Sequence, residues 1–597
     1  MAYESRDQIP VRYTWDLSSI YPNDEAFLAA LEKAQEYPAR LESYQGKIAQ
    51  DPEQLLALLK LDDEVGIAMG KLVNYAQRKS DEDTRNSTYQ DYASRVMTLY
   101  TEVASAESWF APELMRIDDA TMTRFYEQVP GLVPYRRNLD LVFSRRAHTL
   151  SPSEEQLLAK ASDLASQPEN IYSLFADANL AFADAHDSQG KAHPVTHGTF
   201  IPLMMSPDRS LRESAYKSMY AAYGQFRDTC AATLAAQMKT QHFYAEARRY
   251  PDTLTWALEQ NEIPTAVYLN LIKAVHRNLP ALHKYLSLRK RILGVEELRF
   301  WDVYVPLAKD VEPAFTYEEA CTLILRALEP MGKDYCAIVK KGLSERWVDV
   351  YETPGKRSGA YSAGGYGMHP VICMNFQGKL DDVFTLIHEM GHSVHTYLSC
   401  ENQPPAYADY TIFVAEVAST CNEALLTRYL LSHTEDTGLR SYVLNHFLEQ
   451  FRGTLYRQCL FAEFELKVNE LCADGKGITA DSLCALYRQL KADYFGPEIT
   501  VDDGIALEWA RIPHFYYGYY VYQYATGFAA AIALSRRIIE EGQPAVEDYL
   551  GFLSGGSSKP PIELLRGAGV DMATPAPIDA ALEWFDILVD ELTAVLE

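Results

Sequence analysis

Residues 384–392 read Phe-Thr-Leu-Ile-His-Glu-Met-Gly-His, and this stretch contains the pattern H-E-x-x-H inside an apolar-periodic segment. In a helix of 3.6 residues per turn, His388 and His392 lie one turn apart on the same face, so their imidazole nitrogens can converge on one ion. Glu389 follows the first histidine directly and can reach a water molecule beside that ion. Imidazole ligands and an open coordination position are typical of zinc in a reactive site.

A core helix whose histidines only form hydrogen bonds with neighbours is the alternative. Asp381 and Asp382 suit the first turn of the helix. Two histidines and a glutamate buried in a core would each need a polar partner, and this favours the metal site. Apolar residues surround the pattern with the spacing of a buried helix: Val383, Phe384, Leu386, Ile387, Met390, Val394 and Leu398.

A zinc hydrolase needs a third protein ligand. A third histidine six positions after His392 is absent, because Leu398 occupies that position. Residues 410–426 predict another helix, which is apolar except for a stripe at positions i, i+3, i+4 and i+7. The stripe consists of Glu416, Ser419, Thr420 and Glu423.

A polar stripe on a buried helix needs a buried partner, and the metal is the simplest one. We therefore predict Glu416 as the third ligand and Glu423 as the acceptor of a ligand histidine N–H. A solvent-exposed face is the alternative, but such a face usually carries Lys and Glu pairs, and no basic residue occurs before Arg428. Glu401 and Asp409 are weaker ligand candidates.

His395 lies three residues after His392, on the same face of the predicted helix. It could line a cleft, orient a carboxylate beside the ligands, or belong to the core. The sequence does not distinguish these three roles.

Residues 511–524 are rich in hydrogen-bond donors, with tyrosines and a histidine in close succession. Helical spacing would place Tyr516 and Tyr519 or Tyr520 on one face, where their hydroxyl groups could donate to a developing oxyanion. His514 and Tyr517 are further candidates for contact with a substrate. An aromatic core helix is the alternative, and composition alone does not decide between the two.

A glycine-rich segment at residues 356–367 precedes a predicted strand at residues 370–376, directly before the metal-binding helix. Glycines allow another backbone to come close, and an edge strand here could pair with an extended peptide through main-chain hydrogen bonds. Gly364, Gly365 and Tyr366 are therefore predicted to bind substrate. A flexible loop between strands is the alternative.

The rest of the pattern is mainly helical, and a chain of 597 residues predicts two or three subdomains. Residues 180–184 and 194–200 predict a β-hairpin. Long helices resume after residue 206. Helical periodicity is found upstream at residues 24–43, 52–79, 83–109, 120–128 and 153–166, the last with a capping signal at residues 151–155.

Charge and composition narrow the partners. The net charge of −27 argues against nucleic acid. Nine cysteines without paired short spacings fit reduced thiols rather than a disulfide framework or a second zinc site. No apolar run approaches the roughly 18 residues of a membrane span, and residues 1–7 lack the apolar core of a signal peptide. We therefore expect a cytoplasmic protein without a membrane partner, and the oligomeric state stays open.

These motifs together resemble those of the oligoendopeptidase F branch of the thimet oligopeptidase family of zinc metallopeptidases. The resemblance covers roughly the last two-thirds of the chain. The matching blocks are V-T-H-G-T-F at 195–200, G-A-Y-S at 359–362, C-M-N-F at 373–376, H-E-M-G-H at 388–392, F-V-A-E-V-A-S-T-C-N-E-A-L-L at 413–426, H-F-Y-Y at 514–517 and Y-Q-Y-A-T-G at 522–527.

The resemblance implies one zinc ion per chain, held by His388, His392 and Glu416, with Glu389 as the base. It also implies that His514 and Tyr516 or Tyr519 belong to the segment that binds substrate and stabilises the oxyanion.

The fold that the resemblance helps to predict is mainly α, a two-lobed helical clam shell with a small antiparallel β-sheet next to the active site. Residues 1–200 would form an N-terminal helical lobe with a small hairpin near residues 180–200. Residues 201–597 would form the catalytic domain. A channel between such lobes would admit short unfolded peptides and exclude folded proteins.

The expected function is zinc-dependent hydrolysis of internal peptide bonds in short unstructured oligopeptides. Zinc lowers the pKa of a coordinated water molecule to about 7, and Glu389 can accept its proton and pass it to the leaving nitrogen. Two alternatives stay open: a metal-dependent carboxypeptidase on a similar helical fold, and a helical peptide-binding scaffold with a structural metal. A structural zinc site normally has four protein ligands, which argues against the scaffold.

Overall fold

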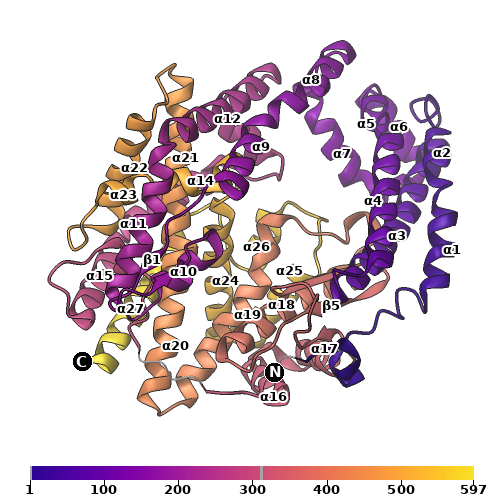
Figure 1. The fold of residues 1–597 in the computed structure, drawn as a ribbon. Helices are drawn as coiled ribbons and strands as arrows, with labels where there is room; N and C mark the ends of the chain where they lie inside the picture. The colour runs from indigo at the N-terminus through magenta and orange to yellow at the C-terminus, as the bar shows by residue number, and fades with distance from the viewer. Residues whose placement is uncertain (1–2, 309–312) are drawn as a thin grey trace. The chain divides into compact units, whose positions relative to one another are not determined.

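The computed structural model describes residues 3–308 and 313–597, and most of them lie in α-helices (Figure 1). The chain forms two compact units, each assembled from three separate segments. Unit 1 consists of Met1–Ala147, Glu312–Tyr429 and Leu534–Gly569, and unit 2 consists of His148–Val311, Leu430–Ala533 and Val570–Glu597. The predicted mainly α fold is confirmed. The clam shell and the division into residues 1–200 and 201–597 stay predictions.

Unit 1 contains the N-terminal helices, a three-stranded sheet and the helices that carry the predicted metal ligands. Its helices and strands are α1 (Asp24–Ala34), α2 (Tyr37–Glu42), α3 (Pro52–Glu82), α4 (Ser87–Glu107), α5 (Phe110–Leu114), α6 (Asp119–Gln128), α7 (Arg136–Ser144), α16 (Tyr317–Ala327), α17 (Gly332–Ser344), β3 (Val348–Asp349), β4 (Tyr361–Gly365), β5 (Met368–Cys373), α18 (Leu380–Asn402), α25 (Gln543–Leu553) and α26 (Pro561–Gly567).

Unit 2 is helical apart from one short hairpin. Its elements are α8 (Pro152–Ala165), α9 (Gln167–Ser173), β1 (Ala185–His186), β2 (Ala192–His193), α10 (His197–Met204), α11 (Arg209–Gln225), α12 (Arg227–Ala247), α13 (Thr253–Glu259), α14 (Thr265–Arg277), α15 (Leu279–Leu293), α20 (Thr437–Gln450), α21 (Arg457–Ala473), α22 (Ala480–Phe495), α23 (Asp503–Ala506) and α27 (Ala576–Leu596). α19 (Ile412–His433) and α24 (Tyr522–Glu541) contribute residues to both units.

Local capping explains where the N-terminal helices begin. The side chain of Asn23 accepts a hydrogen bond from the Ala26 N–H and starts α1, and Asp51 does the same for α3. The predicted helix over residues 24–43 is divided into α1 and α2, and α4 begins at Ser87 because Asn86 caps it. These helices bury Phe27, Leu72 and many other apolar side chains in one core, each contributing about 1.5–3 kcal/mol.

The predicted hairpin exists, but its strands differ from the prediction. β1 and β2 are antiparallel, with two residues each, and lie inside the predicted limits of 180 and 200. Residues 197–200 belong to α10, so the strand predicted over residues 194–200 is wrong. The reason is a capping box: the Thr196 hydroxyl accepts from the Thr199 N–H, and the Thr199 side chain accepts from the Thr196 N–H.

The glycine-rich region before α18 forms the predicted sheet, with the strand order β3–β5–β4. β4 is antiparallel to β5, but β3 runs parallel to β5, so the sheet is mixed and not purely antiparallel as predicted. A parallel pair needs a long connection between its strands, and residues 350–367 supply it. β4 lies at one end of the strand order, so one of its edges has no strand partner in the described part of the chain.

The sequence predicts neither a membrane-spanning helix nor a disulfide framework. Within residues 3–308 and 313–597, none of the helices combines the length and apolar character needed to cross a bilayer. All nine cysteines are free thiols, as predicted.

Candidate metal centre

The helix α18 carries the H-E-x-x-H pattern and begins where the sequence predicted. The carboxylate of Asp382 accepts hydrogen bonds from the backbone N–H groups of Gln377 and Lys379, and this fixes the first turn. Val383, Ile387 and their apolar neighbours are buried on the core side. The helix is therefore held firmly by its apolar stripe while His388 and His392 point away from that stripe.

A glycine allows α18 and α19 to lie in direct backbone contact. A Cβ atom at Gly391 would lie 2.6 Å from Ser419 Cα and 2.8 Å from the carbonyl oxygen of Ala418. No side chain fits into this space, so the glycine inside H-E-M-G-H determines how closely the two helices approach. This close approach brings Glu416 on α19 opposite the two histidines on α18.

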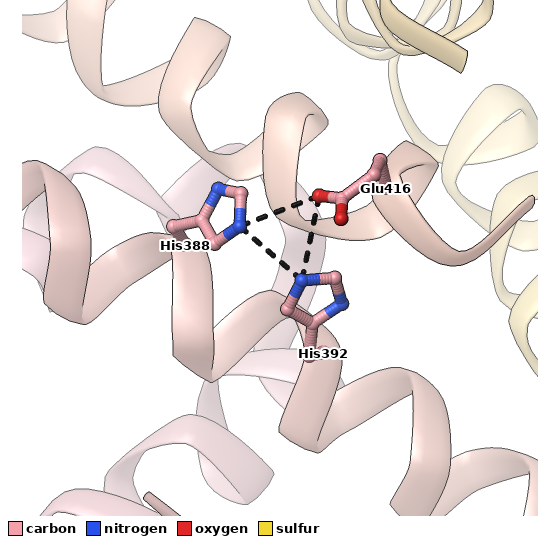
Figure 2. Close-up of side chains that lie close together, drawn as sticks. All are labelled: His388, His392 and Glu416. Carbon is pink, nitrogen blue, oxygen red and sulfur yellow. Dashed lines mark hydrogen bonds and ion pairs between the residues drawn. The ribbon is translucent and has the colours of Figure 1, made fainter. Parts of the chain in front are cut away.

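The three predicted ligands converge on one point (Figure 2). Glu416 Oε2 lies 3.4 Å from His388 Nε2 and 3.5 Å from His392 Nε2, and the two Nε2 atoms are 3.2 Å apart. A tetrahedral zinc ion with bonds of about 2.0–2.2 Å would separate its ligand atoms by about 3.3–3.6 Å. The side chains therefore already form the triangle that such an ion requires.

Glu423 lies behind the first histidine. Its Oε1 atom is 2.5 Å from His388 Nδ1, so the hydrogen bond leaves Nε2 directed at the other two ligands. Burial lowers the pKa of His388, but hydrogen bonds to Glu416 and Glu423 outweigh burial and raise the pKa to about 10. This negative environment favours a positive charge at the centre of the cluster.

Glu416 is subject to the opposite effects. Burial raises the pKa of its carboxyl group, but hydrogen bonds from His388 and His392 outweigh burial and hold the pKa well below its ordinary value. The Ser419 hydroxyl also donates to Glu416 Oε2 over 3.1 Å. Glu416 is therefore a carboxylate, the form in which it can bind a metal.

Two residues that the sequence analysis did not identify connect the helices around the cluster. The Asn422 side-chain amide donates to the carbonyl oxygen of Ile387 over 3.2 Å, and the Tyr335 hydroxyl donates to Asn422 Oδ1 over 2.8 Å. Both side chains are buried, and they join α17, α18 and α19. Asn422 directly precedes Glu423, but a single buried asparagine gives no periodic signal by which it could have been found.

Glu389 lies on the buried side of the cluster, with 7% of its surface exposed. Burial raises the pKa of its carboxyl group above the ordinary value, while the charges of His388 and His392 and a hydrogen bond from the Ser362 backbone act in the opposite direction. The contact with Ser362 places Glu389 beside strand β4. The carboxyl group therefore lies between the histidines and the edge strand.

His395 is a core residue. It is 1% exposed, its ring stacks on Tyr410 with 3.7 Å between ring centroids, and Phe552 lies on the same cluster of rings. Burial lowers its pKa to about 3, so the ring is neutral. Of the three roles that the sequence left open, the structure supports packing in the core. The role of orienting a carboxylate beside the ligands stays a prediction.

Comparison with known families connects this geometry to a group of enzymes. The sequence model of peptidase family M3 matches residues 202–584, more than half of the chain, and the model of oligopeptidase F matches residues 113–182. The chain belongs to peptidase family M3. This membership confirms the resemblance found from the motifs, and together with the His-His-Glu cluster it supports a metallo-oligopeptidase.

Relatives in family M3 cover the chain from end to end. Oligopeptidase PepF of Bacillus subtilis is 44% identical over 99% of this chain and 88% of its own length. The oligoendopeptidase F homologue of Lactococcus lactis is 38% identical over 100% of this chain and 99% of its own. Oligoendopeptidase-F from Enterococcus faecium, a solved structure, is 36% identical with a TM-score of 0.74, covering 97% of this chain and 99% of its own.

The M3 chain places the predicted substrate-binding residues Gly364 and Gly365 in β4 and Tyr366 in the turn that follows it. β4 lies directly against the metal-binding helix, since the hydroxyl oxygens of Ser362 and Ser393 are 2.8 Å apart. A Cβ at Gly364 would lie 3.1 Å from the Thr396 side chain of α18. The glycine therefore brings the strand close to the helix, and its contact with substrate stays a prediction.

The four predicted residues of the tyrosine-rich segment, His514, Tyr516, Tyr517 and Tyr519, belong to unit 2 of the M3 chain. The segment is not one helix, so the shared helical face predicted for Tyr516 and Tyr519 is wrong. A 3-10 turn ends at Tyr516, and both Gly518 and Tyr519 then have positive φ, 66° and 51°. Positive φ interrupts a helix, and α24 begins only at Tyr522.

Two of these hydroxyl groups have partners inside unit 2. The Tyr516 hydroxyl is 2.8 Å from Thr233 Oγ1, and the Tyr519 hydroxyl is 2.9 Å from Thr253 Oγ1. Both tyrosines are buried, whereas Tyr517 is 49% exposed. Burial and the charge of Arg457 lower the pKa of His514, which is therefore neutral at pH 7. The roles of all four residues in the reaction stay predictions.

Proposed function

We propose that this M3 peptidase is a zinc-dependent oligoendopeptidase that hydrolyses internal peptide bonds of short unstructured peptides. The observation that carries the proposal is the triangle of His388 Nε2, His392 Nε2 and Glu416 Oε2, with separations of 3.2–3.5 Å. Two imidazoles and one carboxylate are a donor set that zinc accepts, and three protein ligands leave one position open. The names of the relatives, oligopeptidase and oligoendopeptidase, agree with the proposed substrate class.

The ligand arrangement fits one zinc ion per chain. Glu423 fixes the tautomer of His388 from behind, and the Ser419 hydroxyl orients the Glu416 carboxylate. When bound, zinc supplies a Lewis acid that polarises the scissile carbonyl and makes a nearby water molecule more acidic.

Glu389 performs the proton transfers in this proposal. As a carboxylate it accepts a proton from the attacking water, and as a carboxylic acid it then donates that proton to the leaving nitrogen. Its burial and its position next to His388 suit both steps, because the carboxyl group is largely shielded from bulk solvent while the reacting water at the ligands stays within reach. The Ser362 backbone holds the carboxyl group on the side of β4.

The edge of β4 that has no strand partner among the described residues would bind the peptide backbone. An extended peptide that adds to this edge would make main-chain hydrogen bonds with Gly364 and its neighbours, independent of the peptide's sequence. Such binding favours unfolded chains, because folded proteins seldom offer an unpaired strand. In the proposed complex His514, Tyr516 or Tyr519 donates to the oxyanion and Tyr517 contacts the peptide.

Two further parts of the proposal come from the sequence. We propose short peptides as the partners rather than nucleic acid, because the net charge is −27. We also propose the cytoplasm as the compartment, where nine free cysteines would stay reduced.

The test compares Glu389→Gln with a matched variant, Glu401→Gln, in which the glutamate lies on the same helix but is exposed and does not belong to the cluster of His388, His392 and Glu416. The substrate is an internally quenched peptide blocked at both ends, and zinc content is measured in parallel. We expect Glu389→Gln to keep zinc and lose about 10²–10⁴-fold in rate, and Glu401→Gln to keep both. Wild-type cleavage by a zinc-loaded Glu389→Gln protein would disprove the mechanism.

Product analysis separates the proposed function from a carboxypeptidase. Mass spectrometry of the digest should show two fragments from an internal bond of the blocked peptide. If only unblocked peptides are cleaved, with release of single C-terminal residues, the endopeptidase assignment is wrong. Binding of peptide without any cleavage, with zinc present, would instead support the scaffold.

A further inference from the structure

A small cavity inside unit 2 is lined by many cationic side chains. Its volume is about 20 Å³, room for one particle of about the size of a water molecule. Most of its wall is aromatic or apolar. Among the described residues on the wall, the charged ones are Arg452, Arg457, Lys491, Arg511 and a single acid, Glu508.

The single acid, Glu508, is already surrounded by hydrogen-bond donors. Its carboxylate accepts from Lys491 over 2.6 Å, from Arg457 over 2.9 Å, from Tyr487 over 2.7 Å and from Arg511 over 3.2 Å. One negative charge thus faces three cationic side chains. Two of the three positive charges have no counter-charge in this group.

The fourth cationic side chain on the wall, Arg452, belongs to a neighbouring group of three charged residues. Arg452 donates to Glu449 Oε2 over 2.6 Å, and Glu449 Oε1 also accepts from the fully buried Arg289 over 3.0 Å. The two groups together therefore contain five cationic side chains and two carboxylates. The whole chain carries a net charge of −27, so this interior excess of positive charge is the reverse of the overall balance.

Burial makes this excess of positive charge energetically unfavourable. Arg452 is 5% exposed and Lys491 is 2% exposed, and an uncompensated charge in such a place costs several kcal/mol. Aromatic faces offset part of this cost: Lys491 Nζ lies 5.3 Å from the centre of the Phe300 ring, and the Arg452 guanidinium lies 4.9 Å from that of Tyr304. Rings supply only a partial negative charge, so a full counter-charge is still required.

The environment of Tyr304 reports the same excess. Burial would raise the pKa of this phenol, but the positive charges of Arg457, Arg452 and Arg511 outweigh burial and lower the pKa below its ordinary value. The cavity therefore stabilises a negative charge placed inside it.

The backbone at this place is also unusual. Arg452 lies in a π-helical turn, Phe451–Tyr456, that connects α20 to α21, and Arg457 is the first residue of α21. π-helical turns are rare and occur frequently at functional sites. Here the wider turn brings the side chains of Arg452 and Arg457, five positions apart in the sequence, to the same cavity.

We propose that the cavity binds one monatomic anion of the halide class, of which chloride is the physiological member. Guanidinium and ammonium N–H groups of Arg452, Arg457, Arg511 and Lys491 surround the ion, and the Tyr304 hydroxyl is a further donor. The volume selects the size of the ligand, because a space for one water-sized particle admits a halide and excludes carboxylates and phosphate. The bound ion compensates the excess charge and holds α21, α22 and the 3-10 turn Glu508–Arg511 together.

Bromide gives a direct test, because it scatters anomalously and is close to chloride in size. Crystals of the wild-type protein grown in sodium bromide should show an anomalous peak in the cavity, within hydrogen-bonding distance of Arg457. A well-ordered cavity without such a peak would overturn the proposal.

Thermal unfolding supplies a second measurement that does not depend on crystals or on activity. At equal ionic strength, chloride should raise the Tm of wild type by about 2 °C or more over gluconate, which is too large for the cavity. Arg457→Gln should abolish this difference, and Arg488→Gln should keep it, because Arg488 lies on α22 with 41% of its side chain exposed and pairs with Asp503. Equal Tm values for wild type in the two salts, or a chloride effect that survives Arg457→Gln, would refute the site.

Discussion

Gly391→Ala should disable the metal centre while leaving most of the fold intact. The new Cβ would lie 2.6 Å from Ser419 Cα and 2.8 Å from the carbonyl oxygen of Ala418, and both are backbone atoms. Carbon atoms pack at about 3.5 Å or more, so α18 and α19 would have to separate by about 0.9 Å. No side-chain rotation can relieve this overlap.

The expected effect on zinc binding is larger than the effect on stability. Ligand distances in a metal site are tolerated within about 0.2 Å, and a shift of about 0.9 Å would take Glu416 beyond that range. We expect zinc affinity to fall by more than about 100-fold, the upper range for loss of a partner behind a ligand. Insertion of the methyl group into a packed interface should cost about 1–3 kcal/mol of unfolding free energy.

Competition with a chromophoric chelator measures zinc affinity, and urea unfolding measures stability. Gly66→Ala is the matched control, because Gly66 also lies in a helix of unit 1 but a Cβ there would meet no atom within 4 Å. That variant should bind zinc as wild type does and gain up to about 1 kcal/mol of stability. If Gly391→Ala binds zinc with wild-type affinity, the close contact of α18 and α19 does not determine the position of Glu416.

Three further predictions concern the ligands and unit 2. Glu423→Gln should lower zinc affinity by about 10–100-fold in the same competition assay with little change in stability, because His388 loses a charged acceptor; an unchanged affinity would count against this role. Burial raises the pKa of Glu465 from 4.5 to about 8 in the folded state, so unfolding should become easier as pH rises from about 5 to 8, by up to about 5 kcal/mol. Glu465→Gln should remove this dependence in urea unfolding at pH 5.5 and 8.5, whereas an unchanged pH slope would mean that another group titrates. Removal of zinc with a chelator should abolish peptide cleavage and lower the Tm, and added zinc should restore both; full activity of metal-free protein would contradict the zinc mechanism.

The cluster of His388, His392 and Glu416 was largely predictable because its signals are periodic. His388 and His392 lie one helical turn apart, and the polar stripe Glu416 to Glu423 follows the same spacing on an otherwise buried helix. The contact between these two helices depends on Gly391. The glycine is visible in the sequence, but its role becomes clear only when the position of α19 against it is known. The first turn of α18 near Asp381 followed from the sequence, whereas α19 extends from Ile412 to His433 and continues beyond the predicted residues 410–426.

Other parts could not be predicted, for reasons visible in particular residues. The strand expected over residues 194–200 is a helix, because the capping box of Thr196 and Thr199 acts more strongly than the apolar composition. The break at Gly518 and Tyr519 involves a positive φ at a tyrosine, which the carboxyl group of Glu465 stabilises by accepting a hydrogen bond from the Tyr519 N–H over 2.6 Å. The cationic cavity brings together residues 304, 452, 457, 491, 508 and 511, and no local pattern links such distant positions.

The division of unit 1 into three segments has a consequence for synthesis of the chain. α18 and α19 carry all three ligands by residue 416, but α25, which supplies Phe552 to the rings around His395, is translated much later. Until then the apolar side of α18 lacks its last cover, and unit 1 depends on contacts between residues several hundred positions apart. The need to form such long-range contacts slows folding and leaves apolar surface exposed while the chain is still being translated. We therefore expect the nascent chain to need a chaperone until about residue 569 has emerged, and to acquire its metal only after release.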